Sequence, residues 1–183
     1  WVLITIVFFL VRLMPGDPFT SAKLTDEVRA NMEAYYGFDK PMIVQYGIYM
    51  VNLLHGDFGY SMKYTNKTVN DIIGETFPFS ADLGIRALLL ALSIGLVLGI
   101  VSARNRGKKL DFFCVIVAVL GTSIPDFIMG AALQYFFGIK WGLFPVARYE
   151  GIEYTILPAF ALAFYTLASV SRIMRASMLE VTS

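Results

Sequence analysis

The chain has 183 residues, of which 57% are hydrophobic and only 16% are charged, and its mean hydropathy is +0.64. This composition argues against a soluble globular domain and is typical of a protein that crosses a membrane several times. A formal net charge of +1 gives no reason to expect a nucleic-acid partner, while one cysteine and one histidine argue against an internal disulfide and a dedicated metal site.

The first segment is an apolar run that begins at Trp1 and continues to Met14. We interpret residues 1–14 as the last half of a membrane helix, in which Arg12 can extend toward the lipid head groups. Because the run begins with tryptophan rather than methionine, we expect the chain to be a piece of a longer protein. The sequence PGDP at 15–18 should end the helix, since two prolines and a glycine leave no regular hydrogen-bond ladder.

Charged residues return between residues 15 and 78, which we interpret as an extracytoplasmic region of short helices. Thr25 is followed by two carboxylates and predicts a helix start, with the helix ending near Gly37. A second helix is expected from Met42 to Leu54. At that length it is too short to span a bilayer and suits the membrane surface or the side of a helix bundle.

One more short helix is predicted before the second span. Thr68 and Asp71 have the spacing of a capping box, in which each residue bonds the backbone of the other. The pattern predicts a helix from Val69 to Phe77, which Pro78 should end because proline lacks a backbone donor.

Residues 83–103 are almost uniformly apolar and are predicted as the second span. Gly95 and Gly99 lie four residues apart, which places them on one helix face and favours close helix packing. Arg86 lies about one turn inside the outer end of this span. We expect it to anchor the helix or to pair with a carboxylate in a neighbouring segment or in a segment outside this chain.

A short basic loop at residues 104–111 orients the chain. It contains the sequence RNRGKK, and the positive-inside rule places such a loop in the cytoplasm. The region before the second span then lies outside, as does the loop at 140–154. A fourth span at 155–171 returns inward, so that residues 172–183 begin a cytoplasmic region.

The third predicted span, residues 112–139, carries polar groups near its middle. Pro125 should kink the helix, and Asp126 lies close to the bilayer midplane, where a carboxylate costs roughly 2.5–3.5 kcal/mol. We therefore expect this segment to face other helices or a watered cavity. Ser123, Pro125 and Asp126 are candidates for a solute path or for the kink itself, and the alternative for Asp126 is a carboxyl group bonded to backbone or to a neighbouring helix.

No catalytic, cofactor-binding or metal-binding residue can be assigned from the sequence. It contains no phosphate-binding loop of the type GxxxxGK[ST], no HExxH and no GxSxG. We therefore do not expect this chain to hydrolyse ATP itself.

Several short motifs together resemble one family, the inner-membrane permease subunits of bacterial oligopeptide and dipeptide ABC importers. Each motif is weak alone, but their order and spacing cover nearly the whole chain. They are LMPGDP at 13–18, FDKP at 38–41, LHGDFGYS at 54–61, GTSIPDF at 121–127, WGLFPV at 141–146, ILPA at 156–159 and RIMRASMLEV at 172–181.

The resemblance implies an all-α polytopic helix bundle in the bacterial cytoplasmic membrane. It implies a complex in which two permease subunits form the pathway for a peptide. Two further subunits would bind ATP and Mg²⁺, and an extracytoplasmic solute-binding protein would deliver the peptide. The cytoplasmic coupling loop of the family is expected to follow residue 183.

Three alternatives remain open from the sequence. A related permease could carry nickel or another small solute. A membrane scaffold subunit would need the spans but not the polar groups. An intramembrane enzyme using Asp126 would need a partner carboxylate or a nucleophile and base at similar depth, and the spans offer none.

Overall fold

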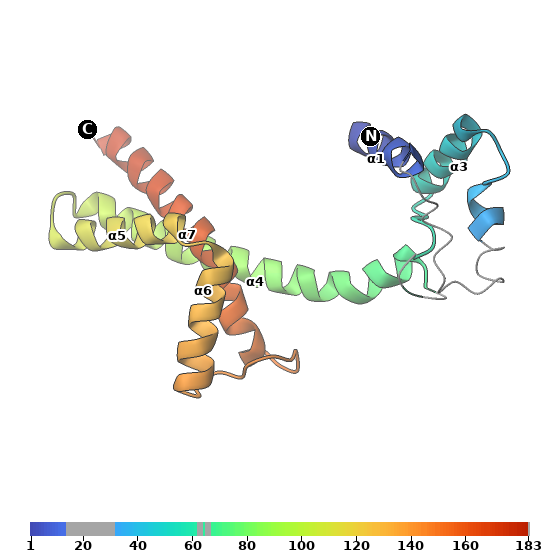
Figure 1. Cartoon of the computed structure of the whole chain (residues 1–183). Helices are drawn as coiled ribbons and strands as arrows, with labels where there is room; N and C mark the ends of the chain where they lie inside the picture. The colour runs from blue at the N-terminus through green and yellow to red at the C-terminus, as the bar shows by residue number, and fades with distance from the viewer. Residues whose placement is uncertain (14–31, 62–63, 65–66, 183) are drawn as a thin grey trace. The chain divides into compact units, whose positions relative to one another are not determined.

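The computed structural model describes residues 1–13, 32–61, 64 and 67–182 (Figure 1). Every named element in this part of the chain is a helix, and Tyr60 and Thr68 form an isolated β-bridge. The prediction of an all-α protein is confirmed. The chain divides into two compact units, Trp1–Phe77 and Pro78–Ser183. The expected helix stop at 15–18 and the helix start at Thr25 lie outside the described residues.

The first unit contains helix α1 (Val2–Leu13), a helical turn at residues 32–36 and helix α3 (Met42–Leu54). Helix α3 has the bounds that the sequence predicts, and Pro41 precedes it. The ring of Phe8 packs on Tyr46 and Tyr49, each with its centroid 5.4 Å away. Burial of these rings joins α1 to α3.

The sequence suggests that Arg12 extends toward the lipid head groups. In the structure its side chain instead turns toward α3. Its guanidinium donates a hydrogen bond to Gln45 Oε1 and lies 4.6 Å from the centroid of the Phe38 ring. Gln45 is itself buried and donates to the carbonyl of Lys40 at 2.8 Å. Buried polar groups need hydrogen-bond partners, which explains why Arg12 turns toward the buried Gln45.

Helix α4 (Val69–Arg104) starts at the capping box that the sequence predicts. The backbone N–H of Thr68 donates to Asp71 Oδ2 at 3.0 Å, and that of Asp71 donates to Thr68 Oγ1 at 3.0 Å. The predicted helix end at Pro78 is wrong, because α4 continues through it. A proline costs roughly 3 kcal/mol inside a helix, whereas ending the helix there would leave its last four carbonyls without helical partners.

The second unit contains the rest of α4, followed by helices α5 (Lys109–Ser123), α6 (Asp126–Leu133), the π-helix η1 (Gln134–Lys140) and α7 (Glu153–Thr182). Its hydrophobic core lies where α4 meets α7. Alanines dominate that core, so the helix axes can approach closely. The buried residues are Ala87, Ala91, Ala163 and Leu167, with Leu90, Ile94 and Leu98 packed against them.

The segment predicted as one kinked span, 112–139, is instead broken into two helices. The axis of α5 and that of the α6–η1 segment differ by 108°, and Figure 1 shows α6 leaving the end of α5 steeply. Ile124 has φ −94° and ψ 120°, the extended conformation that a following proline imposes. Pro125 therefore ends α5 rather than merely bending it.

Two helices of the described residues are long and apolar enough to cross a membrane, α4 and residues Glu153–Val181 of α7. The broken α5–α6 pair counts as a third crossing only if it is one span, since a 108° bend also suits a re-entrant loop. Helices α1 and α3 are apolar but shorter.

Candidate functional site

Helices α4 and α7 meet at the glycines that the sequence singles out. A Cβ atom added to Gly95 would lie 2.8 Å from the carbonyl oxygen of Leu167. One added to Gly99 would lie 2.6 Å from Met174 Cβ and 2.8 Å from the carbonyl oxygen of Ser171. Real Cβ atoms do not come this close to other heavy atoms, so a side chain at either position would push the two helices apart.

Helix α5 approaches α7 in the same way. A Cβ atom on Gly121 would lie 2.5 Å from Ala168 Cβ and 3.0 Å from the carbonyl oxygen of Phe164. Helix α6 also lies against α7, where Ala161 is the neighbour of Gly130. Helix α7 is thus the element on which α4, α5 and α6 all rest.

The predicted polar group at the proline break is arranged differently from the expectation. Ser123 is the last residue of α5 and Asp126 is the first residue of α6, and both are exposed in this chain, as is Pro125. Asp126 makes no hydrogen bond or ion pair with any described residue. The shielding by a neighbouring helix that the sequence predicts is therefore not found within the described chain.

A physical reason for this difference lies in the break itself. Because Pro125 ends α5, Asp126 stands at the positive N-terminal end of a new helix. A carboxylate at this end of a helix is favoured by the helix dipole. The three candidates therefore share one exposed helix junction.

A buried carboxylate that the sequence did not single out lies near the basic loop. Asp111, in the first turn of α5, is only 6% exposed. Arg175 of α7 donates from Nε to Oδ1 and from a terminal nitrogen to Oδ2, both at 2.9 Å. Ser102 of α4 donates to Oδ1, and the Gly107 N–H donates to Oδ2 at 2.9 Å.

These four residues, Ser102, Gly107, Asp111 and Arg175, form what we call the Asp111 cluster. It joins the end of α4, the basic loop, the start of α5 and α7 at one point. A two-pronged arginine–carboxylate contact is both strong and directional. An acidic residue in the first turn of a helix after a basic loop is visible in the sequence, but its partner 64 residues away is not.

A second polar cluster joins the middle of α4 to the loop that precedes α7. Asp82 of α4 accepts a bond from Arg86 Nε at 2.8 Å and another from the hydroxyl of Tyr149. The rings of Phe79 and Tyr149 meet edge to face at 5.0 Å. We call these residues, Phe79, Asp82, Arg86 and Tyr149, the Asp82 cluster. Arg86 thus pairs with a carboxylate one turn upstream on its own helix, and not with one in a neighbouring segment as the sequence predicts.

The loop that carries Tyr149 has an unusual backbone. Ala147 has φ 62° and Arg148 has φ 124°, the left-handed region that residues other than glycine rarely adopt. The bond to Asp82 raises the pKa of the Tyr149 hydroxyl above its ordinary value. A cavity of about 460 Å³ lies between this loop and α4, and Asp82, Arg86 and Glu150 are among the residues that line it.

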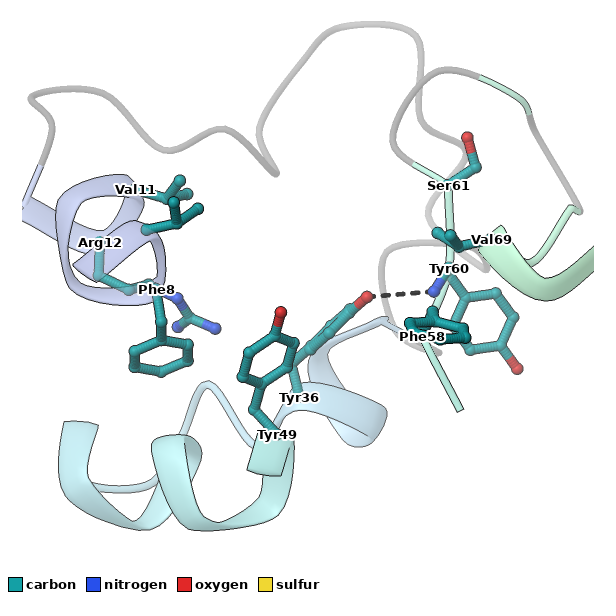
Figure 2. Close-up of a pocket in the computed structure, with 10 residues that line it drawn as sticks. Phe8, Val11, Arg12, Tyr36, Tyr49, Phe58, Tyr60, Ser61 and Val69 are labelled. Carbon is teal, nitrogen blue, oxygen red and sulfur yellow. Dashed lines mark hydrogen bonds between the residues drawn. The ribbon is translucent and has the colours of Figure 1, made fainter. Parts of the chain in front are cut away.

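The first unit has its own pocket, of about 410 Å³, which Figure 2 shows in close-up. The hydroxyl of Tyr36 accepts a bond from the Tyr60 N–H at 3.1 Å, and burial raises the pKa of Tyr36. The guanidinium of Arg12 lies at the edge of the pocket. The lining residues are Val7, Phe8, Val11, Arg12, Tyr36, Tyr49, Phe58, Tyr60, Ser61 and Val69.

Comparison with known proteins places these features in a family. A family model described as the inner membrane component of binding-protein-dependent transport systems matches residues 95–183. This match contains the α4–α7 contact at Gly95 and Gly99, the Asp111 cluster and the broken α5–α6 pair.

Curated relatives match over nearly the whole chain. The oligopeptide transport system permease protein OppB of Salmonella typhimurium is 42% identical over 184 residues, which cover 99% of this chain and 60% of the relative. The dipeptide transport system permease protein DppB of Bacillus subtilis is 40% identical over 181 residues, 98% of this chain and 59% of the relative. The chain thus spans about 60% of the length of these relatives. Over residues 95–183 the chain thus matches the inner membrane components of binding-protein-dependent transport systems, and over nearly its whole length it is similar to these two permease proteins.

Proposed function

We propose that this chain is part of a permease subunit of a bacterial ABC importer and that the imported solute is a peptide. The observation that carries the proposal is an identity of about 40% over nearly the entire chain to proteins named for oligopeptide or dipeptide transport. The apolar helices α4 and α7 support a position in a membrane. A transport permease moves its solute without changing it chemically and is not an enzyme.

The proposal includes the location and orientation of the chain. The protein would cross the cytoplasmic membrane several times, with the basic turn at residues 105–108 on the cytoplasmic side. The Asp111 cluster then lies near the cytoplasmic face. The Asp82 cluster, which joins the middle of α4 to the loop that precedes α7, lies near the outer face.

The partners follow from the family and are part of the proposal. A second permease subunit would complete the pathway, and two ATP-binding subunits, with ATP and Mg²⁺, would supply the energy. A solute-binding protein outside the cytoplasmic membrane would deliver the peptide. This chain would bind no cofactor of its own.

The helix packing suggests how such a subunit could move. Gly95 and Gly99 bring α4 close against α7 with no side chain between the two helices. The α5–α6 junction at Pro125 is the natural place for the remaining angle change, because its backbone is extended. Alternating access of this kind needs rigid helices and a few places that bend.

Ser123 and Asp126 are the residues of this chain that we propose to line the solute path. They present a hydroxyl and a carboxylate at an exposed helix junction within an apolar segment. Polar groups in such a segment are costly toward lipid and are suited to a watered pathway.

Uptake by the complete transporter tests the proposed function. The full-length protein and its partner subunits would be reconstituted in proteoliposomes, and uptake of a radiolabelled tripeptide and of ⁶³Ni²⁺ would be measured with and without ATP. We expect ATP-dependent peptide uptake that requires this subunit. Nickel uptake without peptide uptake would reject the peptide assignment, and uptake of both solutes at unchanged rates without the subunit would reject the permease role.

A further inference from the structure

We propose that Asp111 and Arg175 are positioning residues that lock the cytoplasmic half of α7 to α5, so that a displacement of α7 is passed on to the α5–α6 junction. The proposal rests on the function proposed above. It assigns to this ion pair the transmission of movement between the cytoplasmic end of the subunit and the broken segment.

The geometry of the pair fixes both distance and orientation. Two nitrogens of the Arg175 guanidinium meet two oxygens of the Asp111 carboxylate, each at 2.9 Å. Two parallel hydrogen bonds hold the plane of the guanidinium against that of the carboxylate, whereas a single hydrogen bond would leave the two groups free to rotate. Helix α7 therefore cannot slide or turn relative to α5 at this point without breaking both bonds.

The surroundings of Asp111 make the contact stiff. The Asp111 side chain is 8% exposed and that of Arg175 is 30% exposed, so water has little access to the carboxylate. Ser102 and Gly107 fill the remaining acceptor positions of the same carboxylate. If Arg175 moves away, the negative charge keeps only these two neutral donors in a site that excludes water, which disfavours the separated state.

The pair lies where a displacement of α7 can be passed to α5 and, along α5, to the break at Pro125. Helix α7 continues from Arg175 to Thr182, on the side where the basic turn lies. Helix α5 runs from Lys109 through Asp111 to Ser123, immediately before the break at Pro125. A push on the end of α7 therefore reaches the break through one helix, provided that α5 and α7 are locked together.

The apolar contacts between α5 and α7 do not provide such a lock. Gly121 meets Ala168 and the Phe164 backbone across a smooth surface of small residues. Contacts of this kind bring helices close but are not directional, so they permit the small sliding seen between packed helices. The Asp111–Arg175 pair fixes the position of α7 along α5, which the apolar contacts do not.

The test separates coupling from assembly. Arg175→Gln and Arg175→Lys would be introduced into the full-length subunit of the reconstituted complex, and peptide uptake and ATP hydrolysis would both be measured. Arg172→Gln is the matched control, because Arg172 lies on the same helix and is exposed. We expect both Arg175 variants to keep hydrolysing ATP while the number of peptides transported per ATP falls by roughly fivefold or more, and Arg172→Gln to keep the wild-type ratio.

A reversible link keeps the test decisive if Arg175→Gln fails to assemble. Asp111→Cys and Arg175→Cys would be combined with Cys114→Ala, and the two thiols joined by a bis-methanethiosulfonate reagent that a reductant removes. We expect the linked protein to transport with the wild-type ratio and the same sample to lose coupling on reduction. An unchanged ratio after reduction, or a parallel loss of uptake and hydrolysis in every variant, would overturn the proposal. A wild-type complex that imports no peptide would instead reject the proposed function.

Discussion

Gly99 of α4 and Met174 of α7 lie so close that a Cβ atom on the glycine would stand 2.6 Å from the Cβ of the methionine. The atoms that a Cβ on Gly99 would meet are Met174 Cβ and the carbonyl oxygen of Ser171, neither of which can move aside by a change of side-chain rotamer. The two helices that are long enough to span the membrane therefore depend on the absence of a side chain at this point.

Replacing Gly99 by leucine should separate α4 from α7. We expect a fall in the thermal midpoint of the detergent-solubilised protein and a loss of transport, since overpacking typically costs about 1–3 kcal/mol. Gly84→Ala, on the same helix, is the control, because a Cβ atom at Gly84 would meet nothing within 4 Å. That variant should be stable or slightly more stable. Equal effects of the two substitutions would contradict the packing role of Gly99.

Pro125→Ala should relax the junction between α5 and α6. Without the proline ring, Ile124 is no longer held in the extended region and α5 can continue past Ser123. Spin labels at the exposed positions Phe113 and Ile128 should therefore report a longer and broader distance distribution. Pro78→Ala in α4 should leave that distribution unchanged, because the helix is already continuous there. An unchanged distribution in Pro125→Ala would show that packing against α7, not the proline, holds the angle.

The Tyr149 bond to Asp82 should be lost in strong base. The bond raises the pKa of Tyr149 above its ordinary value of 10.0. A raised pKa means that the contribution to stability is complete below the ordinary value and is lost as pH rises through the folded-state pKa. Tyrosine absorbance near 295 nm should therefore show one late-titrating group fewer in Tyr149→Phe than in the parent, in which the pKa values of Tyr35, Tyr36 and Tyr154 are raised as well. An unchanged number of late-titrating tyrosines in Tyr149→Phe would contradict the assignment.

The same substitution should free the loop that Tyr149 ties down. Ala147 and Arg148 hold positive φ angles, which cost of order 1–3 kcal/mol each and persist only where the surroundings impose them. We expect a cysteine at Glu150 to react several-fold faster with a water-soluble maleimide in Tyr149→Phe than in the parent, with Cys114→Ala in both. An unchanged rate would show that the loop is held by other contacts.

Arg12→Lys should loosen the first unit although the charge is kept. Lysine cannot place a planar fork between Gln45 and the Phe38 ring, and a cation–π contact contributes about 0.5–2 kcal/mol. Limited proteolysis between α1 and α3 should become faster. Lys67→Met is the control, since its pair with Glu75 is exposed and such pairs contribute little. Equal protection in both variants would argue against a role for Arg12.

Local chemistry explains which parts of this fold the sequence predicts. The capping box of Thr68 and Asp71 depends on residues three positions apart and is read directly from the chain. The sequence also locates the disturbance at Pro125, although it predicts a kink there and the structure has a break. Pro78 shows the limit of the same argument. Its breaking tendency is real, but α4 continues through it, since one missing donor costs less than the four open carbonyls of a helix end.

Contacts between distant residues set the other limit. Asp82 could have been paired with Arg86 from their spacing of four, which is the standard helical ion-pair distance. Nothing in a single sequence connects Asp82 with Tyr149, 67 residues later, or Asp111 with Arg175. Asp126 was assigned to a shielded midplane because one continuous span was assumed, and a 108° break removes that assumption.

The spacing of the Asp111 cluster also bears on how the chain is made. At roughly 5–20 residues per second, the ribosome needs about 3–13 s to add the 64 positions between the acid and its arginine. In that interval the nascent α4–α5 hairpin already carries Ser102 and the Gly107 amide, nine and four residues from the carboxylate. The hairpin can therefore hydrogen-bond the Asp111 carboxylate during insertion, and Arg175 completes the set of donors when α7 is added.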